Sequence, residues 1–462
     1  MSTRVPFVGL LVAIAVAIWI SGCSSLPASP SGQETGTTSV AVTPSLTITS
    51  TIQEPSPTLT PVTGKVFVDV RTEVGKISPL VYGTNVGPWQ NITRSMRPFL
   101  TKAGFALFRF PGGNWGDEYL LTHQQLDKFV AFCQEEHAVP LVQVNLFQGS
   151  PEEAAELVRY ANVVRGYGIQ YWNIGNEPDL YAVTRGEVDY TTSKFNADWK
   201  RFAAAMRAVD PSIKFVGPEI SAYTGTEHDR RDRDGKLWMP EFLKANGKQV
   251  DVVSFHWYPF GKPGADRESL LAQPAEWDSV IQRLRVATRR YVGRDLPIAV
   301  TEANSDWTGA EGGEATPDSF NNALWWADVL GRLMRQRVFM VGQFALSGAR
   351  GLGLLSLDGP RPTYYVYLFY RRFGDTMVYA SSPYRMTPVY ASTGEGFVSL
   401  MVVNKQPHDV QLPLEVAGAK LARKGEYWRL DAHGWSQGVL EGSTLSLPAF
   451  SATVFRWRIA QK

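Results

Sequence analysis

The feature that most constrains the fold is a regular alternation of short apolar runs with amphipathic stretches, from residue 76 to about residue 373. Each run ends in polar or glycine-rich residues, and the stretch after it has helical spacing. Continuous apolar strands that alternate with helices are typical of a parallel sheet. The runs are LVYGTNVG (80–87), ALFRFPGG (106–113), PLVQVNLF (140–147), YWNIGNEP (171–178), KFVGPEIS (214–221), VVSFHWYPF (252–260), PIAVTEANS (297–305) and VFMVGQFALSG (338–348).

Eight such units in roughly 300 residues predict an α/β fold in which the strands close into a (β/α)8 TIM barrel, spanning residues 76–373. A doubly wound open sheet is the alternative, but no Gly-x-Gly-x-x-Gly motif follows the first run. Helix-start signals fit the alternation. After the third run, Ser150, Pro151 and Glu153 supply an N-cap, a first-turn proline and a capping-box partner. After the seventh, Thr316 and Pro317 are expected to open a helix.

After about residue 374 the pattern changes to short strands separated by turns, as in GFVSLMVVNK (396–405) and LPAFSATVFRW (447–457). These strands predict a small antiparallel β-sandwich domain over residues 374–462. The run KVFVDV (65–70) precedes the barrel. We expect a strand within residues 63–75 to join this sandwich.

The N-terminus carries the features of a secretion signal. Arg4 is followed by an apolar run over residues 6–20, which is shorter than the roughly 20 residues needed to span a bilayer. The sequence ISGCSS that follows resembles the bacterial lipoprotein processing box, so residues 1–23 are read as a lipoprotein signal peptide with lipid attached at Cys23. An uncleaved anchor or an ordinary signal peptide is the alternative. The prediction places the protein outside the cytoplasm, lipid-anchored to a bacterial membrane.

Residues 24–62 are rich in Ser, Thr and Pro and contain almost no large apolar residues, which predicts a disordered linker. The formal net charge of the chain is only +2, without a long basic run, so nucleic acid is not an expected partner. Cys133 shares helical spacing with apolar neighbours and is expected in the core. The scattered histidines form no metal-ligand motif, and we predict neither a metal nor a cofactor.

Polar residues gather where the apolar runs end, which in a barrel of this kind is the rim that carries the active site. Glu177 ends the fourth run and Glu302 ends the seventh, so the two carboxylates are expected to face each other across the barrel mouth. Each alone could be a satisfied strand-end carboxylate, paired for example with Arg109. Together they match the paired carboxylates that glycoside hydrolysis requires. The full set of polar residues at these ends is Asn85, Arg109, Asn114, Asn176, Glu177, Glu219, His256, Tyr258, Glu302 and Gln343.

Four motifs, at the ends of the second, fourth, sixth and seventh runs, give the chain a resemblance to a known clan. NIGNEP and VTEAN resemble the signatures of the retaining (β/α)8-barrel glycoside hydrolases of clan A. FRFPGGNWGD, HWYP and the trailing sandwich are similar to the arabinofuranosidase, β-xylosidase and heparanase-like branches. The likeness covers residues 64–462. One departure is that Ala303 precedes Asn304 where many members have an aromatic residue before the asparagine, which weakens assignment to a single family.

The resemblance implies a role for each matching residue. Glu177 matches the acid/base and Glu302 the nucleophile, so the first must carry a proton and the second must be ionised. Asn176 matches the amide that holds the sugar 2-hydroxyl, and Arg109 an arginine that supports the nucleophile. His256 and Tyr258 match groups near the nucleophile. We further expect Asn85, Asn114 and Gln343 to line the substrate site, with Trp115, Trp257 and Trp307 either stacking on sugars or serving only as packing residues.

The sequence therefore predicts a retaining glycoside hydrolase that acts on the O-glycosidic bonds of a poly- or oligosaccharide by double displacement. A catalytically inactive sugar-binding surface lipoprotein would keep the barrel and the aromatic residues, but it would have no need of both Glu177 and Glu302. A transglycosylase would use the same residues and differ only in its acceptor.

Overall fold

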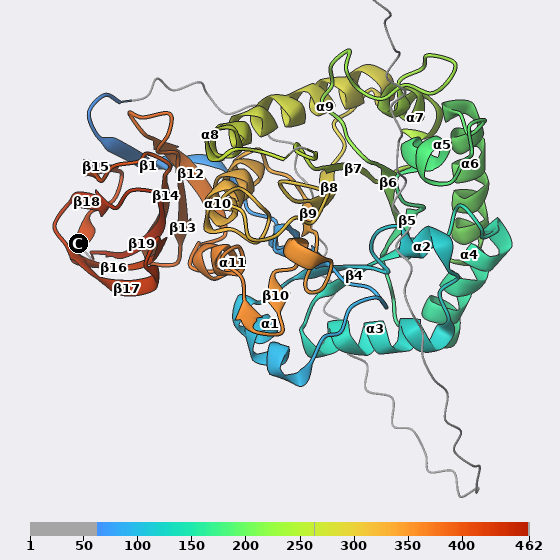
Figure 1. The fold of residues 1–462 in the computed structure, drawn as a ribbon, viewed down its shortest axis with the longest axis horizontal. Helices are drawn as coiled ribbons and strands as arrows, with labels where there is room; N and C mark the ends of the chain where they lie inside the picture. Colours follow the sequence, from blue (N-terminus) through green and yellow to red (C-terminus); the bar gives the residue numbers. More distant parts are fainter. Residues whose placement is uncertain (1–61, 263, 461–462) are drawn as a thin grey trace, which may run out of the picture. The chain divides into compact units, whose positions relative to one another are not determined.

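In a computed structural model, which describes residues 62–262 and 264–460, the eight predicted runs form eight parallel strands closed into a barrel (Figure 1). The last strand pairs with the first through Gly342 and Gly83, which closes the ring. This confirms the predicted barrel. The barrel strands are β2 (Gly83–Asn85), β3 (Leu107–Phe110), β4 (Val139–Val144), β5 (Tyr171–Ile174), β6 (Lys214–Ile220), β7 (Val252–Trp257), β8 (Ile298–Ala303) and β9 (Met340–Gln343).

Helices follow the barrel strands and cover the outside of the ring (Figure 1). Within the described ranges, none of them is long and apolar enough to cross a membrane. The signal peptide, Cys23 and all but the last residue of the predicted linker lie outside the described residues. The helices are α1 (Arg97–Ala103), α2 (Trp115–Glu118), α3 (His123–Glu135), α4 (Pro151–Val158), α5 (Tyr181–Thr184), α6 (Thr192–Val209), α7 (Trp238–Asn246), α8 (Arg267–Ala272), α9 (Glu276–Val292), α10 (Phe320–Arg335) and α11 (Tyr364–Tyr370).

The helix-start signals were right in one case and wrong in the other. Ser150 and Glu153 form the predicted capping box at the start of α4. Helix α10, however, is capped by Ser319, whose side chain accepts from the N–H of Asn322. Thr316 instead donates to the carbonyl of Gly313 within the preceding turn, so its hydroxyl serves a turn rather than a helix cap.

The interior of the barrel divides into an apolar end and a polar end. Inward-pointing side chains near the N-terminal ends of the strands form one buried apolar layer. The C-terminal rim is left for polar groups. This layer consists of Leu80, Leu107, Leu141, Tyr171, Val216, Val252, Ala299 and Met340. Residues adjacent to these in sequence, such as Phe108 and Val253, point outward into the main core under the helices. Cys133 is buried in that core, as predicted.

The C-terminal strands form a nine-stranded sheet in the order β17-β16-β19-β14-β13-β12-β1-β15-β18, with its own buried apolar core. Strand β1 (Val66–Lys76) pairs with β12 in the antiparallel sense but with β15 in parallel, so the domain is not wholly antiparallel. The other strands are β12 (Thr376–Ser381), β13 (Val389–Gly394), β14 (Phe397–Asn404), β15 (Val410–Ala417), β16 (Leu421–Asp431), β17 (Gly434–Glu441), β18 (Thr444–Leu447) and β19 (Ser451–Ile459).

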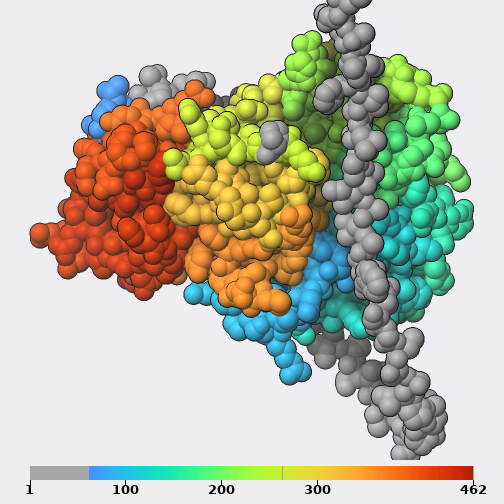
Figure 2. All heavy atoms as spheres, in the orientation of Figure 1, coloured from blue at the N-terminus to red at the C-terminus, as the bar shows by residue number. Residues whose placement is uncertain are grey.

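A buried ion pair joins the barrel to this sheet. Lys405, just after β14, donates to Asp328 of α10 at 2.5 Å and to the carbonyl of Leu271 of α8 at 2.7 Å. Burial raises the pKa of Asp328, but Lys405 and Arg332 lower it further, so the carboxyl stays ionised. In Figure 2 the red surface of the sheet meets the yellow surface of α8 at this boundary.

Candidate active site

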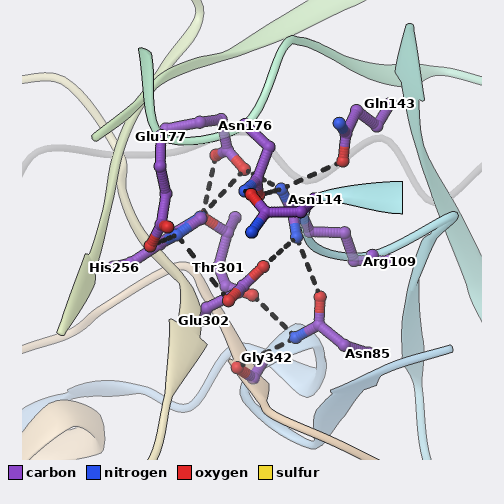
Figure 3. A network of polar contacts seen from close by, with 12 residues as sticks. Asn85, Arg109, Asn114, Gln143, Asn176, Glu177, His256, Thr301, Glu302 and Gly342 are labelled. Atoms are coloured by element: carbon purple, nitrogen blue, oxygen red, sulfur yellow. Dashed lines mark hydrogen bonds and ion pairs between the residues drawn. The ribbon is translucent and has the colours of Figure 1, made fainter. Parts of the chain in front are cut away.

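The polar side chains labelled in Figure 3 point toward one another at the rim of the barrel. They come from different strands, because parallel strands in a barrel all end at the same rim. Two of them sit where the backbone turns sharply: Glu177 has φ +48° and Glu219 has φ +61°, both in the left-handed region that non-glycine residues seldom adopt.

Arg109 lies at the centre of the hydrogen bonds and ion pairs of the rim. Its side chain is fully buried, and Nη1 donates to Glu302 Oε1 at 2.7 Å and to Asn85 Oδ1 at 3.0 Å. Nη2 donates to Asn176 Oδ1 at 2.9 Å and lies 2.9 Å from Glu219 Oε2. The planar guanidinium therefore links groups from β2, β6, β8 and the loop after β5.

Glu302 receives donors on both of its oxygens. Arg109 holds Oε1, and the hydroxyl of Tyr258 donates to Oε2 at 2.9 Å. Burial, together with the charge of Glu302, raises the pKa of Tyr258 well above its usual value, so the phenol keeps the proton that it donates. The two hydrogen bonds fix the direction of the Glu302 carboxylate.

Glu177 has a more open environment. Its side chain is 15% exposed, against 5% for Glu302, and Oε1 lies 3.0 Å from His256 Nδ1. Neither Arg109 nor Tyr258 donates to it. Its carboxyl group can therefore reach a ligand above the barrel mouth.

Two further ionised groups lie beneath these carboxylates. Burial lowers the pKa of His256, but the charge of Glu302 and hydrogen bonds to Glu177 and Glu219 raise it more, to about 10. Burial raises the pKa of Glu219, but the charge of Arg109 and contacts with His256 lower it more, to about 2. At neutral pH His256 is thus a cation and Glu219 an anion.

A buried carboxylate outside this group fixes the loop that carries Asn176 and Glu177. Asp117 of α2 accepts from the N–H of Asn176 at 2.8 Å, the N–H of Leu146 at 3.1 Å and the hydroxyl of Tyr181 at 2.5 Å. It therefore ties together the loops after β3, β4 and β5.

The three remaining predicted amides make hydrogen bonds that hold the rim together. Asn85 donates to the Thr301 carbonyl at 2.9 Å, and Asn114 accepts from Asn176 Nδ2 at 3.1 Å. Gln343 donates to the Leu352 carbonyl at 2.9 Å, so it supports the loop after β9. All three help to build the rim, and Asn114 is the one with an exposed side.

The tryptophans occupy unlike positions. Trp257 is 5% exposed and packs against Trp277 with ring centroids 4.4 Å apart, so it takes the packing alternative, and its expected contact with a sugar does not fit this position. Trp307 is 58% exposed. Trp115 is partly exposed and lies beside Tyr119 at 5.1 Å. The latter two remain candidates for sugar stacking.

Glu177, His256 and Glu302 also lie close enough to offer one ligand atom each to a metal ion, since these atoms are within 4.8 Å of one another. The charges argue against an ion there: His256 is protonated, and the Arg109 guanidinium already holds Glu302 at 2.7 Å. A divalent cation would have to displace a proton and compete with a permanent cation.

The sequence did not identify every member of the site. Glu219 was among the strand-end polar residues, but the sequence predicted no role for it. Asp117, Thr301 and Gln143, which accepts from Arg109 Nη2 at 3.3 Å, were not predicted. Asp117 follows the GGNWG motif closely, and an acidic residue in a glycine-rich loop beside a strand end was a signal that could have been used.

The fold and this arrangement of carboxylates define a glycosidase built on a (β/α)8 barrel. The glycosyl hydrolase catalytic core family matches residues 134–367, and the chain belongs to that family. The predicted membership of clan A is thereby confirmed, as is the prediction that the protein is an O-glycosyl hydrolase.

Among curated proteins, heparanase of Bos taurus is 26% identical over 225 residues, covering 47% of this chain and 38% of heparanase. The chain spans less than two thirds of the length of the curated relatives it matches. Among solved structures, a bifunctional glucanase–xylanase from a metagenome library has a TM-score of 0.68 at 20% identity, covering 88% of this chain and all of that one. The α-L-arabinofuranosidase of Thermotoga maritima has a TM-score of 0.66 at 17% identity, covering 86% of this chain and all of the other.

The protonation of His256 should appear in the pH dependence of stability. Its pKa is about 10 in the folded state and about 6.5 when unfolded, so its stabilising contribution is complete below about pH 6.5 and is lost as the pH rises to about 10. We expect the free energy of unfolding, measured in urea, to fall across this window. The His256→Gln variant should lose that part of the slope, and identical slopes in both proteins would contradict the assignment.

Loss of the Asp117 carboxylate should weaken the protein and displace Asn176. Asp117→Ala leaves three buried donors without an acceptor, so we expect the free energy of unfolding to fall by about 3 kcal/mol. Asp127→Ala is the control, because the partly exposed Asp127 also accepts from two tyrosine hydroxyls, of Tyr160 and Tyr167. Urea unfolding should show a clearly smaller fall in the free energy of unfolding for Asp127→Ala. Equal falls would show that the Asp117 hydrogen bonds stabilise the protein no more than those of a partly exposed carboxylate.

Proposed function

We propose that the protein is a retaining glycosidase in which Glu302 is the nucleophile and Glu177 the acid/base. The observation that carries this proposal is the separation of the two carboxylates: one oxygen of each lies within 4.8 Å of the other. Retaining enzymes hold the carboxyl groups about 5–5.5 Å apart, whereas inverting enzymes leave roughly 6.5–9.5 Å for a water molecule. The spacing here favours direct attack by a carboxylate.

The surroundings of the two glutamates assign their roles. Glu302 Oε2 attacks the anomeric carbon while Oε1 stays on Arg109, and Glu177 gives its proton to the departing oxygen. In the second step Glu177 takes a proton from water, which then cleaves the glycosyl ester on Glu302. Asn176 Nδ2 uses one hydrogen on Asn114 and has a second to donate to a sugar hydroxyl.

The charge of the site stays constant through these steps. Before reaction, the cations Arg109 and His256 balance the anions Glu219 and Glu302 while Glu177 carries a proton. After the first step Glu302 is a neutral ester and Glu177 is the anion. No net charge has to be created in the buried site, and the ionised Glu177 is then ready to act as a base.

The substrate class follows from the relatives only in outline. Named relatives and neighbours are a heparanase, a glucanase–xylanase and an arabinofuranosidase, so we propose a poly- or oligosaccharide substrate with arabinofuranoside, xyloside or related specificity. Products that grow longer with added sugar acceptors would favour a transglycosylase. Failure to hydrolyse any of a panel of aryl arabinofuranosides, xylosides, glucosides and glucuronides would favour the inactive sugar-binding alternative.

The two glutamates should respond differently to substitution. With an aryl glycoside that has a good leaving group, Glu177→Ala should still form the glycosyl-enzyme, because little protonation is needed. Hydrolysis should then stall without a base, giving a burst followed by slow turnover. Azide should restore turnover and yield a glycosyl azide of retained configuration. The measurement is stopped-flow release of the phenol, with product configuration from NMR.

The matched variant is Glu302→Ala, which cannot form the intermediate and should show no burst. Azide that enters the vacated space should attack directly and give inverted configuration. If both variants behave alike, or the stereochemistry is exchanged between them, the two roles have been assigned wrongly.

We also propose that the chain is held at a bacterial membrane, outside the cytoplasm, through lipid on Cys23. Support comes from the apolar run over residues 6–20 and the ISGCSS sequence. Cys23→Ser should appear in the soluble fraction or stay unprocessed, as judged by membrane fractionation and N-terminal mass. A membrane-bound Cys23→Ser protein with a fully cleaved N-terminus would exclude this form of attachment.

A further inference from the structure

Glu219 is placed where it can touch both buried cations but no substrate. Its side chain is 0% exposed. Oε1 accepts from the hydroxyl of Thr301 at 2.7 Å, and Oε2 lies 2.9 Å from Arg109 Nη2 and 3.4 Å from His256 Nε2. Both oxygens are therefore occupied by protein donors. A direct role as acid, base or nucleophile is closed to it, and its effect must pass through Arg109 and His256.

The effect of Glu219 follows from the charges of five groups that lie together, here called the cluster: Arg109, His256, Glu177, Glu219 and Glu302. Arg109 and His256 are two cations, facing the three carboxyl groups of Glu177, Glu219 and Glu302. With all three ionised the buried cluster carries one excess negative charge, and with one proton it is neutral. An uncompensated buried charge is costly. The cluster is therefore most stable when its three carboxyl groups together carry one proton.

The contacts decide which carboxyl group holds that proton. Glu219 faces two cations and a hydroxyl, and Glu302 faces a cation and the phenol of Tyr258. Among the described residues, only His256 donates to the Glu177 carboxyl group, which is the most exposed of the three. Among neighbouring charged groups, Asp117 of α2 is buried beside Asn176 and near Arg185, and Asp179 of η4 (Pro178–Leu180) lies 3.7 Å from Arg230. Burial, together with the charge of the neighbouring Glu177, raises the pKa of Asp179 to about 6.

We propose that Glu219 is a positioning residue that neutralises one of the two buried cations and thereby leaves the proton of the cluster on Glu177. The proposal rests on the acid/base role proposed above for Glu177. Without the charge of Glu219, the two cations would balance Glu177 and Glu302 alone. Glu177 would then be ionised in the resting enzyme and could not protonate a leaving group.

Glu219→Gln tests this, because it keeps the size of the side chain and removes its charge. The alkaline limb of the kcat/KM profile should move to lower pH by roughly one unit or more. At about pH 7, hydrolysis of an alkyl glycoside, which needs protonation, should fall at least about tenfold, while a dinitrophenyl glycoside should change by less than about threefold. Equal losses on both substrates would overturn the proposal.

Two variants serve as controls. Glu219→Asp keeps the charge, so its alkaline limb should stay near that of the wild type. Thr301→Val removes the hydrogen bond to Glu219 without changing any charge, and its alkaline limb should also stay in place. If either control shifts the limb as far as Glu219→Gln does, the effect is one of packing and the proposal is wrong.

A measurement without substrate separates this proposal from the proposed function. In protein labelled with carboxyl-¹³C glutamate, the Glu177 signal is the one missing from Glu177→Gln. It should report a protonated carboxyl at about pH 7 in the wild type and an ionised one in Glu219→Gln. An ionised Glu177 in the wild type, or loss of the proton from His256 instead, would overturn the proposal even if Glu219→Gln fails to fold or no glycoside proves to be a substrate.

Discussion

The buried guanidinium of Arg109 is the interaction on which the rest of the site depends. A guanidinium keeps its charge at any pH a protein meets, so burial obliges the fold to surround it with anions and acceptors. Carboxylates from β6 and β8, an amide from β2 and an amide from the loop after β5 meet this need. The same contacts fix the direction of Glu302. The charge that would otherwise destabilise the barrel is therefore the one that organises its rim.

This constraint also makes two chemically identical side chains unequal. The Glu302 carboxylate accepts hydrogen bonds from Arg109 and Tyr258. Among the described residues, the Glu177 carboxyl group has a hydrogen bond only with His256, and it is more exposed. In the mechanism proposed above, this difference in environment distinguishes the carboxylate that attacks the sugar from the one that donates a proton. Asp117 completes the arrangement by tying the Asn176–Glu177 turn to loops after two other strands.

The sequence could predict the barrel because its signals are local. Apolar runs followed by helical spacing mark the strands, and the strand ends bring Glu177 and Glu302 to one rim whatever the details. The importance of Glu219 depends on distances to Arg109 and His256 across the barrel, which no local pattern contains. The sequence also left open whether Trp257 stacks on a sugar or packs in the core, because the burial of the end of β7 under Trp277 of α9 is not a local signal. Ser319, rather than Thr316, caps α10 because an intervening turn uses the earlier hydroxyl.

The central claim is that Glu302 attacks the sugar while Glu177 supplies and then removes a proton. The configuration of the first product released by the wild-type enzyme tests it most directly. Proton NMR, recorded on an aryl glycoside before mutarotation, should show the anomer of retained configuration, because two displacements occur at one carbon. Initial release of the inverted anomer would show that water attacks directly and would contradict the account.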